Sequence, residues 1–118
     1  MKLRFHGDTL RLRLSQSDVT RLGESGCIED RVQFAPGQAL WYSLESADTE
    51  TIAATFTGDR VRVMLPRAAT AHWIASDETG IEGLSSTLTI HVEKDFQCLH
   101  RNSPEDADSF PNPLAKDS

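Results

Sequence analysis

Hydrophobic and polar residues alternate along residues 2–14 and 52–65, and each stretch contains a central Gly-Asp pair. Period-two alternation is typical of a strand with one buried face, and glycine tolerates the positive φ that a hairpin turn needs. The two stretches correspond position by position, with Phe56 standing 51 residues after Phe5. They share Phe, Gly-Asp, an aliphatic residue, Arg, a second aliphatic residue and a closing Leu. We therefore expect two hairpins of the same kind.

A short helix is expected after the first hairpin. Ser15 with Asp18 three residues later is a capping-box-like start, in which each side chain satisfies a free backbone N–H group. Val19 and Leu22 then lie on one helical face. Gly23 is expected to end this helix in a left-handed conformation.

The second hairpin is also followed by a helix-like segment. Pro66 fits a first helical turn, where its missing N–H costs nothing. Residues 67–76 are Ala-rich, and Trp73 stands at the offset position of Leu22, so we expect it to pack on a sheet. Residues 77–83 contain two glycines and are expected to form a loop.

Three further stretches have strand signals: residues 28–34, 40–44 and 84–92. Pro36-Gly37 predicts a turn between the first two, because Pro presets φ and Gly relaxes the next position. Asp30 is the one misfit on the apolar face of its strand. The predicted order is ββαββ followed by ββαβ.

This order predicts a single mostly-β α+β domain over residues 1–100, built from two ββα-type repeats of about residues 1–45 and 51–93. Short strands and tight turns favour an antiparallel or mixed sheet, or a small barrel, with two short helices. Two related units would hide each other's edge strands. Residues 101–118, rich in Pro and acidic residues, are expected to form an extended or disordered tail.

Composition excludes several classes of protein. A chain of 118 residues is one domain's worth, and 38% hydrophobic with 25% charged residues is ordinary for a globular protein. The net charge of −6 argues against general affinity for nucleic acid or anionic membranes, although it allows a local basic patch. We see no signal peptide and no membrane span, and two distant cysteines, Cys27 and Cys98, fit reduced thiols in a cytoplasmic protein.

The first copy, with its Leu-Arg-Leu-Arg-Leu hairpin and short helix, resembles the swapped-hairpin family of transition regulators and antitoxins. The second copy resembles it at the strand-to-helix junction Val61-Arg62-Val63-Met64-Leu65-Pro66. That family forms intertwined dimers that bind DNA, so the resemblance implies an internal pseudo-dimer. It also implies DNA contacts from Arg11, Arg13, Arg60 and Arg62.

The whole chain resembles a family of small uncharacterised bacterial proteins more closely. The resemblance is carried above all by residues 93–101, Glu-Lys-Asp-Phe-Gln-Cys-Leu-His-Arg, and by Phe110-Pro111-Asn112-Pro113. It implies no activity.

The first candidate site is basic. Lys2, Arg4, Arg11 and Arg13 share the polar face of the first hairpin, and Arg60 and Arg62 that of the second. If the hairpins are related by symmetry, these side chains form one outward stripe on paired strands, suited to a phosphate backbone. The structural alternative is that the arginines solvate an outer sheet face and pair with neighbouring acids.

The second candidate is Cys98 with His100, which point the same way on a strand and suit zinc or a thiol nucleophile. Its alternative is a packed cysteine beside an exposed histidine. The cluster Glu93, Asp95, Glu105, Asp106 and Asp108 lacks the spacing of a calcium loop. There is no P-loop or nucleophile-elbow motif, and we expect no catalytic machinery and no cofactor.

The sequence therefore predicts a small soluble binding or interaction module but does not identify its ligand; a protein partner and a second copy of itself are the candidates. A DNA-binding regulator using the Arg stripe and a metal or thiol site at Cys98 and His100 remain the two alternatives.

Overall fold

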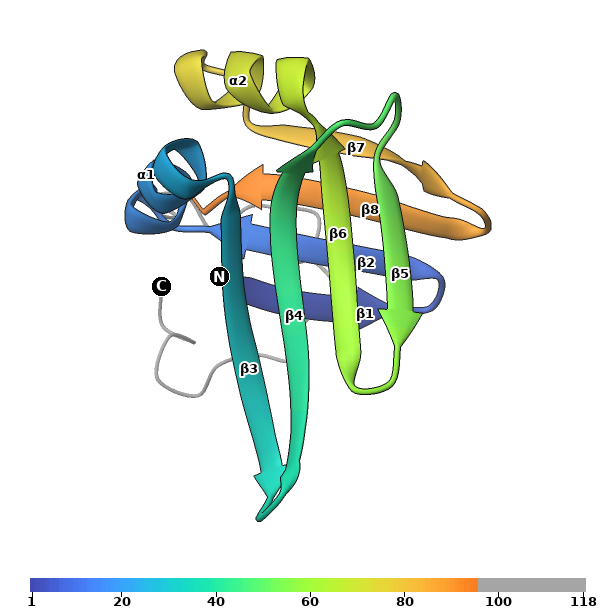
Figure 1. Cartoon of the computed structure of the whole chain (residues 1–118). Helices are drawn as coiled ribbons and strands as arrows, with labels where there is room; N and C mark the ends of the chain where they lie inside the picture. Colours follow the sequence, from blue (N-terminus) through green and yellow to red (C-terminus); the bar gives the residue numbers. More distant parts are fainter. Residues whose placement is uncertain (96–118) are drawn as a thin grey trace, which may run out of the picture.

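The structure, a computed structural model, describes residues 1–95. Eight strands and two helices follow in the order ββαββ, ββαββ (Figure 1). Their bounds are β1 Lys2–His6, β2 Thr9–Leu14, α1 Gln16–Ser25, β3 Cys27–Ala35, β4 Gln38–Ala47, β5 Ala53–Thr57, β6 Arg60–Pro66, α2 Arg67–Ala75, β7 Gly80–Ser85 and β8 Leu88–Lys94. Neither described helix has the length and apolar character that a membrane crossing requires.

The strands form two four-stranded mixed sheets. The first sheet has the order β1-β2-β8-β7 and the second the order β3-β4-β6-β5. Each sheet joins two antiparallel hairpins through one parallel pair, β2 with β8 or β4 with β6. The mostly-β α+β prediction is confirmed. The small barrel is wrong for the described residues, because the strands divide between two sheets that cross each other (Figure 1).

The core lies between the facing surfaces of the two sheets. Leu10, Leu12, Leu14, Ile90 and Val92 of the first sheet belong to the same buried cluster as Leu44, Val61, Val63 and Leu65 of the second. Fully burying one such side chain contributes about 1.5–3 kcal/mol. The helices close this core with Leu22 and Trp73, both nearly inaccessible, which confirms the packing role predicted for Trp73.

Helix α1 begins as the sequence predicts. Ser15 Oγ accepts the Asp18 backbone N–H at 3.2 Å, and Asp18 Oδ2 accepts the Ser15 N–H at 3.0 Å. The predicted end at Gly23 is wrong. The helix continues to Ser25, and Gly26 adopts the left-handed conformation with φ 79° while its N–H donates to the Leu22 carbonyl.

Strand β7 occupies part of the segment predicted to be a loop, and residues 84–92 are not one strand. Gly80 and Gly83 lie inside β7, where glycine allows close approach instead of breaking the chain. The turn to β8 is made at Ser86, with φ 57°. Because the turn contains neither Gly, Pro, Asn nor Asp, and its Ser86 also fits the polar set of a strand, the alternation of residues 84–92 concealed a hairpin.

Candidate functional site

Arg11 and Arg13 lie on the outer face of the first sheet. They alternate with Leu10, Leu12 and Leu14, each about 1% exposed, so their side chains point away from the core. Glu93 of neighbouring β8 forms an ion pair with Arg11, with 3.0 Å between Oε1 and Arg11 Nε, and its Oε2 lies 4.0 Å from Arg13 Nε. These two residues therefore share one carboxylate.

Arg60 and Arg62 lie on the outer face of the second sheet. Arg60 forms an ion pair with Glu29, and Arg62 one with Glu45. The Arg60 guanidinium also lies over the Trp41 ring, 5.3 Å from its centroid, which adds a cation–π contact. Both arginines are thus positioned by contacts with side chains of neighbouring strands in the same sheet.

The structure does not bring the four arginines into one stripe. The two sheets pack through their inner faces, so the outer faces that carry Arg11 with Arg13 and Arg60 with Arg62 point in opposite directions. Strand β2 pairs with β8 and β6 with β4, so the predicted pairing of the two Arg strands is wrong. A role for these residues in DNA binding stays a prediction.

Cys98 and His100 lie outside the described residues. Within residues 1–95, no group of three or more His, Cys, Asp or Glu side chains is arranged to hold a metal ion. Cys27 is a free thiol, and its partial burial together with the carboxylates of Glu45 and Glu29 raises the pKa of the thiol. This keeps Cys27 protonated near neutral pH, in the form that is a poor nucleophile.

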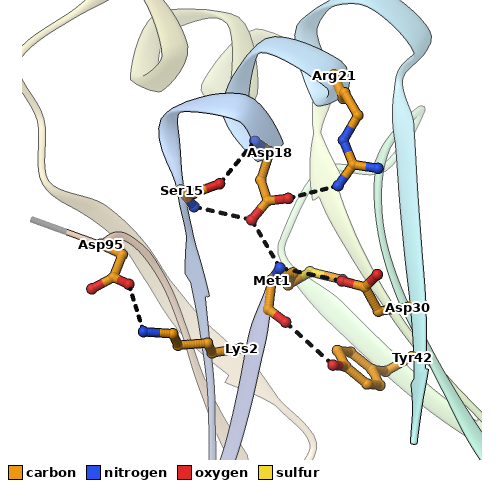
Figure 2. Close-up of polar contacts among 8 residues, drawn as sticks. All are labelled: Met1, Lys2, Ser15, Asp18, Arg21, Asp30, Tyr42 and Asp95. Atoms are coloured by element: carbon orange, nitrogen blue, oxygen red, sulfur yellow. Dashed lines mark hydrogen bonds and ion pairs between the residues drawn. The ribbon is translucent and has the colours of Figure 1, made fainter.

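A cluster of hydrogen bonds and ion pairs joins the start of β1 to α1 and β3 (Figure 2). The α-ammonium group of Met1 lies 2.8 Å from Asp18 Oδ2 and 3.2 Å from Asp30 Oδ2. Tyr42 donates from its hydroxyl to the Met1 carbonyl at 3.2 Å. Asp30, the misfit of the sequence pattern, thus faces inward because it binds this ammonium group.

The electrostatics of this cluster favour charge on both partners. Burial alone would raise the pKa of Asp18, but hydrogen bonds from the Met1 ammonium, the Ser15 N–H and Arg21 outweigh it and hold that pKa well below its usual range. Burial alone would lower the pKa of the Met1 ammonium, and the bonds to Asp18 and Asp30 raise it instead. A carboxylate held ionised in this way anchors structure and is unsuited to act as a general acid at neutral pH.

A mostly apolar cavity of about 470 Å³ opens between the two sheets, where the β1–β2 and β5–β6 hairpins turn. We call it the end cavity. Its lining residues come from both sheets and are Phe5, Leu10, Leu40, Ala54, Thr55, Phe56, Val61, Ser85, Ser86, Thr87 and Leu88. Phe5 and Phe56 are 55% and 71% exposed. Because hydrophobic side chains of this size are usually covered, this cavity is the candidate functional site.

The local sequence explains how both phenylalanines reach the end cavity. Each lies on the inward-facing set of its strand, two residues before a Gly-Asp turn with positive φ at Gly7 or Gly58. The sheet cores end just before these turns, so an inward side chain there is only partly covered. Sequence reasoning noted the repeated Phe but treated it as a strand residue. The position of each Phe beside a turn was the sequence feature that could have indicated its exposure.

A second hollow, of about 430 Å³, lies between the end of β2, the first turn of α1 and the end of β8. Its lining includes Lys94 and Asp95. This hollow is smaller than the end cavity, and the described residues that line it include no aromatic side chain. For that reason the end cavity is the stronger candidate.

The fold defines a small α+β domain of two crossed, mixed four-stranded sheets. Residues 1–114 match the DUF7009 family, a family of unknown function, and the chain belongs to this family. Searches of curated proteins and of solved structures each found no similar protein. The expectation of a family without an assigned activity is confirmed, and the resemblance to swapped-hairpin regulators stays a prediction.

Proposed function

We propose that this protein is a protein-interaction module whose end cavity receives an apolar side chain of its partner. One observation carries the proposal: Phe5 and Phe56 hold the same position in the two hairpins, both are largely exposed, and both line one apolar cavity. Aromatic residues are enriched where proteins bind one another, and exposed apolar clusters mark such surfaces.

The polar groups of the end cavity suit a partner whose inserted side chain is apolar and whose neighbouring backbone groups form hydrogen bonds. Ser85, Ser86, Thr87 and Thr55 stand among the apolar lining residues. Ser86 adopts a left-handed conformation, with φ 57°, that is strained for a residue with a side chain. Strain of this kind clusters at ligand-binding sites, where surrounding structure maintains it.

The apolar surface around the end cavity favours a protein over a small molecule as the partner. The β3–β4 hairpin extends beyond the other strands (Figure 1) and carries Val32 and Phe34, 41% and 70% exposed. Val32 is the cross-strand partner of Leu40, which lines the end cavity, so the two share a sheet face. A small molecule inside the cavity would leave this hairpin uncovered, whereas a protein surface would cover both.

We also propose that the domain consists of two equivalent halves, residues 1–47 and 52–94. Contacts that match between the halves support this. Trp41 N–H donates to the Asp59 carbonyl at 2.8 Å, and Thr89 N–H donates to the Asp8 carbonyl at the same distance. The ion pairs Arg62–Glu45 and Arg11–Glu93 also correspond in position. On this proposal Phe5 and Phe56 are equivalent residues that flank the end cavity from two sides.

A titration followed by NMR tests the interaction module. N-acetyl-phenylalaninamide, a neutral mimic of an inserted aromatic side chain, is added to the labelled full chain. We expect the amide signals of Leu40, Ala54 and Leu88 to shift in a saturable way. Shifts spread evenly over the surface, or none at millimolar probe, would contradict the proposal.

Matched variants complete this test. Phe56→Ser removes one aromatic side chain of the end cavity and is expected to weaken binding of the probe about tenfold, since loss of an aromatic contact costs about 1.4 kcal/mol or more. Leu84→Ser is the control, because Leu84 is 65% exposed but lies outside the cavity lining. An equal loss in both variants would show general hydrophobic adsorption.

A further inference from the structure

The β3–β4 hairpin ends in a stretch without charge. Residues 32–40, which we call the arm, include no Asp, Glu, Lys or Arg. The arm carries the largely exposed Phe34 and extends beyond the other strands (Figure 1). Aromatic side chains are enriched, and charged ones depleted, where proteins bind one another. The arm therefore has the composition of an interface.

The local backbone presents Phe34 at this position. The pairing of β3 with β4 shifts between Gln33 and Ala35, so Phe34 lies in a β-bulge. Gln33 Nε2 donates to the Ala35 carbonyl at 2.7 Å and so spans the bulge. Bulges re-aim side chains and disturb pairing along an edge strand, which β3 is in its sheet. The arm thus offers a partner an aromatic side chain in preference to a regular strand edge.

The end cavity lies a short distance from Phe34 on the same chain. Val32 pairs with Leu40, which lines the cavity, and Phe34 follows two residues later, about 7 Å along the strand. Phe34 is not among the lining residues of its own chain, and none of the described lining residues carries a charge. One chain therefore has an apolar cavity and, beside it, an exposed aromatic side chain that this cavity does not hold.

We propose that the partner of the end cavity is a second copy of this chain, with Phe34 of each copy inserted into the end cavity of the other; this rests on the proposed function and names its partner. A two-fold axis between arm and cavity forms both contacts at once, as in the self-complementary interfaces of most homodimers. Two copies of net charge −6 repel each other. A contact made of uncharged residues keeps that repulsion out of the interface.

The exposed apolar surface is large enough for such a contact. Burying an aromatic side chain hides about 150–250 Å². The exposed parts of Phe5, Phe34 and Phe56 alone therefore offer roughly 300–500 Å² per copy. A standard interface buries about 800 Å² per partner. Val32 and the rest of the arm add to this area, so we expect a reversible dimer.

Sedimentation velocity of the full chain at increasing concentration tests the dimer. We expect a reversible monomer–dimer equilibrium. Phe34→Ser should weaken it about a hundredfold, because one aromatic contact is worth about tenfold and the two-fold axis removes it twice. Leu84→Ser is the control and should leave it unchanged, since Leu84 is similarly exposed but lies outside the arm and the cavity lining. A monomer at every concentration, or equal dimerisation of Phe34→Ser, would overturn the proposal.

Mixing two variants tests whether the insertion is reciprocal. Phe34→Ser keeps the end cavity but lacks the inserted side chain, whereas Ala54→Phe fills the cavity but keeps Phe34. Each alone should dimerise about a hundredfold more weakly than the unaltered chain. The mixture should form a heterodimer that is only about tenfold weaker, because one of the two contacts remains. Folded variants that do not restore each other in this way would overturn reciprocal insertion.

The variant Phe34→Ser also separates this proposal from the proposed function. It leaves the end cavity open, so N-acetyl-phenylalaninamide should bind it at least as tightly as it binds the unaltered chain. Saturable binding of this probe to an unaltered chain that stays monomeric would overturn the second copy as the partner but support the interaction site. Absence of probe binding to Phe34→Ser would contradict the interaction site and the dimer with it.

Discussion

A Cβ atom on Gly83 would lie 2.1 Å from Cγ2 of Ile52, so β7 passes the start of β5 at a distance that only glycine permits. Close by, Ala54 N–H donates to Ser85 Oγ at 3.1 Å. These contacts join an edge strand of the first sheet to an edge strand of the second. The glycine that looks like a loop residue in the sequence is a packing residue at a corner of the fold.

Gly83→Ala should destabilise the protein by about 2 kcal/mol, the typical cost of forcing extra volume into a packed site. Ile52 is buried, and its β-branched side chain is stiff at χ1, so it cannot move aside cheaply. Urea unfolding measures the change. Gly23→Ala is the control: its Cβ would meet Ile74 at 3.8 Å, an ordinary contact, and it should be neutral or stabilising by up to about 1 kcal/mol. Equal losses in both variants would contradict this account of the corner.

Asp18→Asn should destabilise the protein by about 3 kcal/mol, because within residues 1–95 it leaves the buried Met1 ammonium with the partly exposed Asp30 as its one anionic partner. Arg21→Ala removes the solvent-exposed partner of the same carboxylate and should cost less than about 1 kcal/mol. Thermal unfolding at neutral pH compares the two variants. A smaller effect at Asp18 than at Arg21 would show that the buried pair is not an anchor.

The same pair predicts how stability depends on pH. The pKa of Asp18 is lowered from its ordinary value of 3.8, so its contribution is full above that value and is lost as pH falls toward the folded pKa. The pKa of the Met1 ammonium is raised from 8.0, so its contribution is full below 8.0 and is lost as pH rises through the folded value. The free energy of unfolding should be highest between these two values, and Asp18→Asn should flatten its dependence on pH. An unchanged profile in that variant would assign the dependence to other groups.

Cutting the chain after Glu50 should leave the fold assembled. Each sheet contains one hairpin from each fragment, and the parallel pairs β2 with β8 and β4 with β6 join the fragments. Co-expressed residues 1–50 and 51–118 should purify as a 1:1 complex with the circular dichroism spectrum of the intact chain. Leu44→Asp, which places a charge at a fully buried position of β4, should separate them. If the unaltered fragments separate during purification, the account in which each sheet takes one hairpin from each fragment is contradicted.

The sequence predicted most of the local structure because local rules govern it. The Gly7-Asp8 and Gly58-Asp59 turns, the Ser15–Asp18 capping box and the inward Leu and Val residues all occur as expected. Strand β7 was missed because Gly80 and Gly83 make close contacts with neighbouring strands, and because its turn at Ser86 has no Gly, Pro, Asn or Asp to mark it. Tertiary packing therefore determined both the strand and its turn, although the local sequence favoured a loop followed by one strand.

Local sequence rules could predict neither the division of the strands into two sheets nor the end cavity. Alternation shows which side of β2 or β6 is buried, but not which strand each one pairs with. That pairing put Arg11 and Arg60 on opposite faces, and it also brought Phe5 and Phe56 to one cavity. The corresponding positions of the two phenylalanines were visible in the sequence, whereas their convergence needed the fold.

The most direct measurement is the affinity of N-acetyl-phenylalaninamide for Ala54→Phe compared with the unaltered chain. Ala54 lines the end cavity, and a phenyl group there fills the space proposed for the partner's side chain. Filling an apolar cavity maintains or raises stability. We expect binding to weaken at least about tenfold, equivalent to 1.4 kcal/mol, with the thermal midpoint unchanged or higher. Unchanged affinity in a folded Ala54→Phe variant would show that the end cavity is not the binding site.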